Sequence, residues 1–196
     1  QLDVVANDHG VERVEPLLAS PRKKHLIPND PFFAERQPIL PANPIFGNSY
    51  QWYLKNEGTN GGIVDVDIRV EGAWDQQVRG AGVVIGIVDD GVFVGDGVVA
   101  GSPDLDPNAS GPHENFNDGP ANATLGASFQ DRHGTAVAGL ACATFNDGFG
   151  MAGAAPGANF ASIRLVGEGQ LTDDEETAAA LTSGLDQIDI YNNSWG

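Results

Sequence analysis

The stretch VVIGIVDDGV at positions 83–92 decides the fold of this chain. The residues before Asp89 are mostly aliphatic, which is typical of a strand buried on both faces of a parallel sheet. The strand is followed at once by Asp90 and Gly91. In open parallel sheets, ligands and catalytic groups gather at the carboxyl ends of strands. The Asp-Gly pair is equally consistent with an ordinary turn that ends a strand.

Helical and strand patterns alternate after this strand. The predicted segments are a small-residue helix (GTAVAGLACATF, 134–145), a buried strand (ASIRLV, 161–166), a second helix (TDDEETAAALTSGL, 172–185) and a third strand (IDIYNNSW, 188–195). Strand, helix and strand at this spacing require right-handed crossovers. The expected fold class is therefore α/β, with a doubly wound, mainly parallel sheet.

The ends of the second helix are marked by local signals. Thr172 followed by Glu175 predicts a capping box, and Gly184 predicts the stop. The chain reaches Gly196 directly after the third strand, before any helix that could close the sheet. We therefore expect the polypeptide to continue beyond this point.

Composition excludes some classes of partner. With 27 acidic and 10 basic residues the net charge is -17, which repels nucleic acid and anionic membrane surfaces. No apolar stretch approaches the roughly 20 residues of a membrane-spanning helix. Cys142 is the single cysteine, so no disulfide can form within the chain, and its apolar surroundings favour a buried core residue over a reactive thiol.

Asp89 and His133 form the first candidate pair. His133 opens the helix in DRHGTAVAG at 131–139, where small residues allow close packing. Taken alone it fits a helix cap or a surface residue. A carboxylate at the strand end could instead hold the Nδ1 proton of the imidazole, which would leave Nε2 free as a general base.

Three motifs in order, IVDDGV, HGTAVAG and NNSWG, resemble those of the subtilisin-like serine proteases. The likeness covers about residues 27–196, and the doubled Asp, the pieces PND and QWYL, and GLDQIDIYNNSWG are most similar to the kexin and furin branch and its bacterial relatives. The resemblance implies a serine endopeptidase with Asp89 as the catalytic acid and His133 as the general base. It also implies that the nucleophilic Ser, in a GTS motif, lies beyond this segment.

By the same resemblance, the third strand binds substrate. Asn192 and Asn193 match the family's substrate-binding strand rather than its oxyanion donor, and Ser194, Trp195 and Gly196 would offer backbone groups to an extended peptide. An ordinary edge-strand Ser beside a packing Trp is the alternative.

The loop TFNDGFGMAG at 144–153 is the candidate metal site, because a glycine-rich loop can turn several carbonyls toward Ca²⁺ beside a carboxylate. A plain turn remains possible. Resemblance to the family's calcium loop implies these ligands: the carbonyls of Thr144, Phe149 and Met151, and the side chains of Asp147, Asp104 and Asp30.

The resemblance also implies acidic contacts to basic substrate side chains from Asp90, Asp131 and Glu176, with Thr177 as the alternative to Glu176. Acidic residues at a helix start also arise from the helix dipole alone. Cleavage after Lys or Arg is therefore a hypothesis.

The N-terminal residues 1–26 are expected to be either the end of a propeptide or an N-terminal arm, before the peptidase domain at 27–196. VERVEP at 11–16 resembles the end of an inhibitory propeptide, with maturation between Pro21 and Pro28, after Lys24 in one version. We expect a secreted, extracellular or periplasmic protein whose partners are peptide or protein substrates, its own propeptide or a downstream accessory domain.

Two rival interpretations remain at this stage. The first is a non-catalytic relative, a pseudoprotease or binding module that keeps the fold but lacks the nucleophile. The second is an unrelated α/β calcium-binding domain in which the three motifs coincide by chance.

Overall fold

The computed structural model describes residues 28–30, 33, 51–58, 62–95, 101–117, 132–167 and 172–196. Within these ranges the strands are β1 (Val84–Asp89), β2 (Glu114–Asn115), β3 (Asn159–Arg164) and β4 (Ile190–Asn193). The helices are α2 (Glu71–Asp75), the 3-10 helix η1 (Asp106–Asn108), α3 (His133–Cys142) and α4 (Asp174–Thr182).

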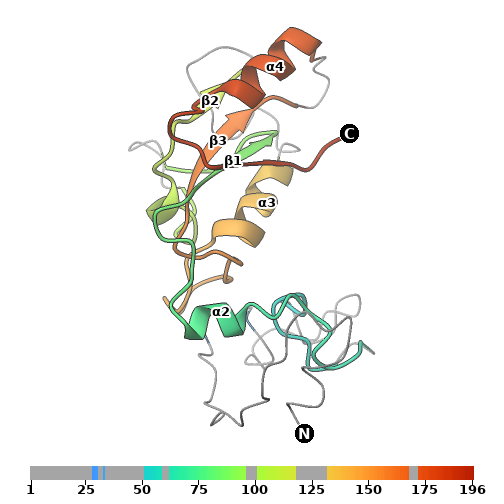
Figure 1. Cartoon of the computed structure of the whole chain (residues 1–196), viewed down its shortest axis with the longest axis vertical. Coiled ribbons are helices and arrows are strands. Elements are labelled where there is room, and N and C mark those ends of the chain that lie inside the picture. The colour runs from blue at the N-terminus through green and yellow to red at the C-terminus, as the bar shows by residue number, and fades with distance from the viewer. Residues whose placement is uncertain are drawn as a thin grey trace, which may run out of the picture.

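The described strands form one parallel sheet in the order β2-β3-β1-β4 (Figure 1). β1 lies between β3 and β4, so that Val88 is in register with Ile163 on one side and with Asn193 on the other. After β1 the chain runs to β2 at the edge of the described sheet, returns to β3 beside β1, and then crosses to β4 on the other side of β1. The predicted doubly wound α/β fold is confirmed, and the strand order reverses at the carboxyl end of β1, where such sheets open a crevice.

Helices α3 and α4 cover opposite faces of the sheet. Successive side chains of β1 point to opposite faces, so adjacent residues pack against different helices. Ile87 packs in one buried cluster with Ala138 and Cys142 of α3. Val88 packs in another with Ala180 of α4. Burial raises the pKa of the Cys142 thiol to about 12, which agrees with the core position expected for it.

The start of α4 differs from the sequence prediction. The capping box is formed by Asp173 and Glu176, one residue later than the predicted pair. Asp173 Oδ1 accepts from Glu176 N at 2.8 Å, and Glu176 Oε2 accepts from Asp173 N at 3.2 Å. Thr172 instead donates its hydroxyl to Leu165 O at 3.0 Å, so it anchors the incoming loop to the end of β3.

A smaller aromatic cluster lies below the sheet around α2. Trp74 is fully buried, contacts Phe33 and Phe145 at ring-centroid distances of 5.8 and 5.4 Å, and donates from Nε1 to Ala154 O. Phe33 N in turn donates to Asp30 O at 3.1 Å. This packing brings the N-terminal PND segment to the loop that follows α3. Among the described residues, no helix has the length and apolarity needed to cross a membrane.

Candidate active site

Asp89 and His133 meet at the carboxyl end of β1. His133 Nδ1 lies 2.9 Å from Asp89 Oδ1 and 3.0 Å from Oδ2, so both carboxylate oxygens face one ring nitrogen. The Asp89 side chain is 1% exposed, whereas that of His133 is 58% exposed. The contact expected from the sequence is therefore present. The buried carboxylate favours the tautomer with its proton on Nδ1, so Nε2, on the opposite side of the ring, is the nitrogen that can accept a proton.

The electrostatics of the pair suit a base. The hydrogen bond and the charge of Asp89 raise the pKa of His133 above its usual value, and the charge of Asp90 acts in the same direction. The imidazolium that forms when Nε2 takes a proton is thus stabilised by a neighbour that is already in place.

Glycine at position 134 allows the pair to meet. A Cβ on Gly134 would lie 2.5 Å from Gly91 O and 2.9 Å from Asp89 Cβ, so a larger residue could not let α3 approach β1 this closely. Thr135 Oγ1 then accepts from Phe93 N at 2.9 Å, which ties the loop after β1 to the same helix turn. Close packing of α3 on β1 therefore explains why Gly and Thr follow His133.

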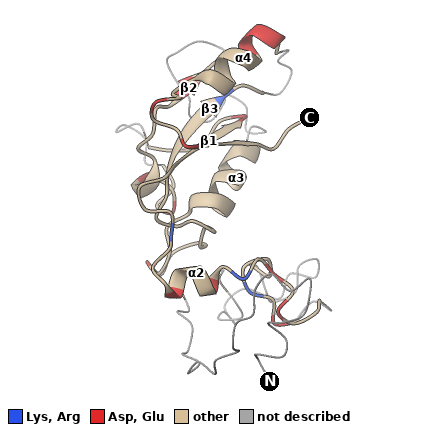
Figure 2. Cartoon of the chain, in the orientation of Figure 1, with Lys and Arg blue, Asp and Glu red and all other residues tan. Residues whose placement is uncertain are grey.

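The three acidic residues predicted to contact substrate are in different situations. Asp90 is 8% exposed and uses both carboxylate oxygens to accept from His133 N and Gly134 N. Glu176 is part of the capping box of α4, whose acidic start is red in Figure 2. Asp131 lies outside the described residues. Contact of these residues with substrate stays a prediction.

The segment after β4 is fastened beside the Asp89–His133 pair. Trp195 Nε1 donates to Val88 O at 2.9 Å, and Ser194 Oγ accepts from Asn192 Nδ2 at 2.9 Å. Strand β4, which precedes this segment, is open to solvent, and its first residue, Ile190, is 52% exposed. The segment of Ser194, Trp195 and Gly196 is thus anchored at the end of β1, and its contact with substrate stays a prediction.

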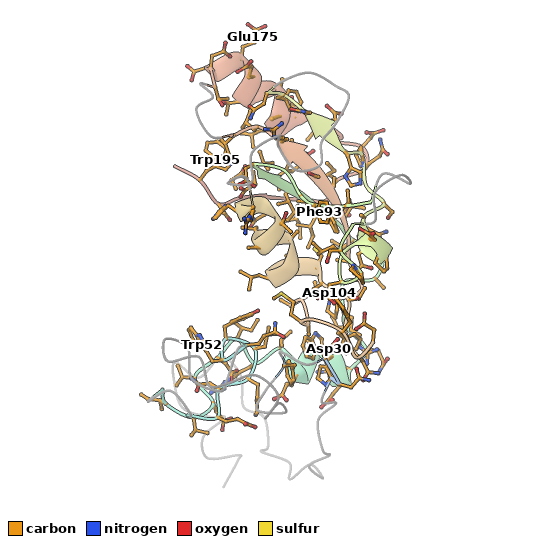
Figure 3. All side chains as sticks on the ribbon, turned by 180° about the vertical axis from the view of Figure 1, so that it is seen from behind. Asp30, Trp52, Phe93, Asp104, Glu175 and Trp195 are labelled. Atoms are coloured by element: carbon orange, nitrogen blue, oxygen red, sulfur yellow. The ribbon has the colours of Figure 1, made fainter. Side chains whose placement is uncertain are left out.

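The loop after α3 brings together the three acidic side chains expected there. Asp30 Oδ2 accepts from Asn146 N at 2.6 Å, and Asp104 Oδ2 accepts from Met151 N at 3.0 Å. Asp147 accepts from the Thr144 hydroxyl at 2.8 Å and from Phe149 N at 2.9 Å. Figure 3 shows Asp30 and Asp104 near each other and well away from Trp195 and Glu175.

Two of the acidic side chains that contact this loop have unpaired buried oxygens. Asp30 Oδ1 and Asp104 Oδ1 are buried without a hydrogen-bond partner. Burial and the nearby Asp147 raise the pKa of Asp30 to about 6, and the same two causes raise the pKa of Asp104. Gly150 keeps the loop close, because a Cβ there would lie 1.8 Å from Asp104 Oδ2. Such oxygens suit a hard cation.

Side chains alone do not complete a metal site. Within the described part of the chain, no group of three or more His, Cys, Asp or Glu has metal-ligand geometry. An ion in this loop would therefore need main-chain carbonyls as well, and the positions predicted for them are Thr144, Phe149 and Met151. The assignment of these carbonyls stays a prediction.

Two features of the site were not anticipated from the sequence. One is the use of Asp90 to hold the start of α3, and the other is the contact of Arg164 Nε with Asp90 O at 3.1 Å. Arg164 is 5% exposed at the end of β3. Its place opposite Asp89 follows from strand register, which no local signal in the sequence specifies.

Comparison with known proteins agrees with this geometry. The model of the subtilase family matches residues 80–196. Proprotein convertase subtilisin/kexin type 4 of Mus musculus is 35% identical over 166 residues, which are 83% of this chain and 23% of the relative. Neuroendocrine convertase 2 of Drosophila melanogaster is 33% identical over 162 residues, 80% of this chain and 23% of the relative. The chain thus spans about a quarter of the length of these relatives.

Solved structures agree with these matches. The serine protease of Aeromonas sobria has a TM-score of 0.70 and 26% identity, covering 95% of this chain and 29% of that protein. The Aeromonas sobria serine protease solved in complex with a chaperone has a TM-score of 0.64 and 29% identity, covering 74% and 24%. With the motif-bearing strand and helix arranged as described, the chain belongs to the subtilase family, and its relatives include the kexin-like proprotein convertases.

Proposed function

We propose that this chain supplies the acid and base of a serine endopeptidase, with Asp89 as the orienting acid and His133 as the general base. The observation that carries the proposal is the contact of His133 Nδ1 with both oxygens of the buried Asp89 carboxylate. A merely structural His at a helix start does not need a buried carboxylate aimed at one ring nitrogen. The solvent exposure of the imidazole leaves its other nitrogen accessible to a reaction partner.

The proposed reaction is acyl transfer through a Ser nucleophile supplied by sequence beyond Gly196. His133 Nε2 takes the hydroxyl proton as the Ser oxygen bonds to the peptide carbonyl carbon, and the same proton then passes to the leaving amine. Asp89 stays ionised and stabilises the imidazolium between these steps. Water then attacks the acyl carbon in place of Ser. His133 Nε2 takes a proton from the water and passes it to the Ser oxygen, and the acyl group leaves as a carboxylic acid.

Labelling with a fluorophosphonate probe tests this function. The complete protein should be labelled at a Ser, and a His133→Ala variant should lose labelling because the Ser is no longer activated. Leu140→Ala, on an exposed position of the same helix, is the matched control. If neither the wild type nor the control is labelled, the chain belongs to a non-catalytic relative.

We also propose that calcium binds in the loop after α3, held by the side chains of Asp30, Asp104 and Asp147 with the carbonyls of Thr144, Phe149 and Met151. The unpaired oxygens of Asp30 and Asp104 support the fit, because a cation would satisfy both and offset the cost of burying two charges. Bound calcium would supply positive charge that stabilises this loop.

Thermal unfolding with and without a chelator tests the calcium site. At a calcium concentration 100 times its Kd, binding stabilises by about 2.7 kcal/mol, so chelation should lower Tm by several degrees. Asp104→Asn should remove most of that difference. Asp106→Asn is the control, since the side chain of Asp106 accepts from Gly95 N and has no contact with the loop after α3 among the hydrogen bonds of the described residues. A Tm that does not respond to chelation in the wild type would count against the site.

We propose that the enzyme prefers peptides with basic residues, because its own charge is strongly negative. The acidic start of α4, with Asp174 and Glu175 exposed, would attract a cationic peptide, and so would the net charge of -17. The sequence resemblance implies contacts from Asp90, Asp131 and Glu176; Asp131 and Glu176 are the ones proposed here, while Ser194, Trp195 and Gly196 would bind the peptide backbone. Equal kcat/KM on matched Arg, Leu and Phe peptides would contradict this specificity.

We propose secretion and removal of a propeptide ending near Lys24 as part of the same function. Residues 1–27 lie outside the described residues, so support comes from the sequence resemblance. N-terminal sequencing of active secreted protein should give a start between Pro21 and Pro28. An intact Gln1 on active enzyme would contradict processing and favour an N-terminal arm within a longer peptidase domain.

A further inference from the structure

We propose that Asp90 is a positioning residue, whose carboxylate holds the start of α3 so that His133 stays aligned with Asp89. This inference rests on the proposed function, and it assigns Asp90 a role different from the substrate contact considered above. It concerns the rate of the chemical step rather than the choice of substrate.

The first N–H groups of α3 need acceptors from elsewhere. The residue before the helix, Arg132, makes no side-chain capping hydrogen bond. Initial helix N–H groups have no partner within the helix. Asp90 supplies both acceptors: Oδ2 accepts from His133 N at 2.9 Å, and Oδ1 accepts from Gly134 N at 2.6 Å. The cap of this helix thus comes from the end of β1, which lies more than 40 positions earlier.

Asp90 is itself held by two hydrogen bonds besides these contacts. Its N–H donates to Asp89 Oδ1 at 2.8 Å, and its carbonyl accepts from Arg164 Nε at 3.1 Å. It is 8% exposed, so its side chain has little freedom to turn away. One residue therefore contacts both members of the pair, Asp89 through its main chain and His133 through its carboxylate.

The arrangement requires a carboxylate rather than another polar side chain. Two oxygens on one group meet two N–H groups that point the same way, and a negative charge at the positive end of a helix adds to the attraction. An amide has one oxygen, and its NH₂ would face a second N–H donor. Asp90→Asn should therefore release one of the two contacts and loosen the alignment of the imidazole.

Kinetics of the complete protein test the inference against a substrate role. Asp90→Asn should lower kcat by about 10- to 100-fold, since displacement of a reacting group by about 1 Å costs about 100-fold, and should leave KM within about twofold. The same losses should occur on peptides with basic and with neutral residues at every position tested. Asp106→Asn is the control. A KM increase confined to basic peptides, with kcat unchanged, would overturn the inference.

An NMR titration gives a readout that does not depend on activity. The His133 signal, assigned by its loss in His133→Ala, should titrate at a lower pH in Asp90→Asn, because one of the charges that favours the imidazolium is gone. An unmoved titration together with an unchanged kcat would overturn the inference. If the wild type proves inactive, the proposed function fails, while the titration still reports whether Asp90 acts on His133.

Should Asp90→Asn not fold, Asp90→Ser is measured in the same way. The Ser hydroxyl keeps one acceptor, while the substitution removes the negative charge. A lower pKa of His133 is therefore expected again. Folding of both variants with wild-type titration and kcat contradicts the proposed role.

Discussion

Gly134→Ala should separate the Asp89–His133 pair without removing either side chain. The added Cβ would lie 2.5 Å from Gly91 O, whereas ordinary contact begins near 3.4 Å. The start of α3 must then retreat by about 0.9 Å. The 2.9 Å contact between His133 Nδ1 and Asp89 Oδ1 would lengthen to about 3.8 Å, which is beyond a hydrogen bond.

A displacement of this size should lower kcat by about 100-fold. The free energy of unfolding should fall only modestly. Overpacking costs about 1–3 kcal/mol, and replacing a helical glycine by alanine returns about 1 kcal/mol. The assay is hydrolysis of an Arg-containing peptide by the complete protein, alongside chemical denaturation to show that the variant is folded.

Gly139→Ala is the matched control on the same helix. Its added Cβ would meet only the side chain of Met151, with Sδ at 3.1 Å, and that flexible chain can shift. We expect kcat within about twofold of the wild type for this variant. A Gly134→Ala enzyme that is folded and has wild-type kcat would refute the claim that close approach of α3 to β1 aligns the pair.

Four further outcomes are expected. Asp89→Asn should lower kcat by about three to four orders of magnitude. In the wild type the Asp89 carboxylate raises the pKa of His133, so its removal should move the acidic limb of the pH–rate profile to lower pH. An unmoved limb would be inconsistent with the pairing. Asp173→Ala should cost about 1 kcal/mol in urea denaturation through loss of the α4 cap. Trp74→Ala should lower the free energy of unfolding by about 3–5 kcal/mol, because the fully buried ring fills the aromatic cluster around α2. Trp195→Phe should raise KM for peptides more than it lowers kcat, since the indole anchors the segment after β4 to the end of β1; equal KM values would argue against a substrate role for this segment.

The secondary structure and the central pair could be predicted because their signals are local. The aliphatic run before Asp89 and the small residues after His133 fix a buried strand and a close-packed helix. Parallel crossovers have one allowed hand, so the strand end and the helix start had to meet at one edge of the sheet. Local signals did not fix the start of α4, because Thr172–Glu175 and Asp173–Glu176 have the same spacing. In the folded chain the Thr172 hydroxyl donates to Leu165 O, and Asp173 forms the cap.

The sequence by itself thus determined an α/β chain with an aspartate and a histidine placed together at the carboxyl edge of its sheet. Tertiary structure alone decided that Asp90 caps α3 and that Asp30 and Asp104 carry unpaired oxygens beside one loop. The physical reason is range: a strand or helix depends on neighbours a few positions away, whereas these contacts join groups more than 40 positions apart. Their partners are chosen by strand register and by the closeness that Gly134 and Gly150 permit, and neither leaves a pattern in the neighbouring residues.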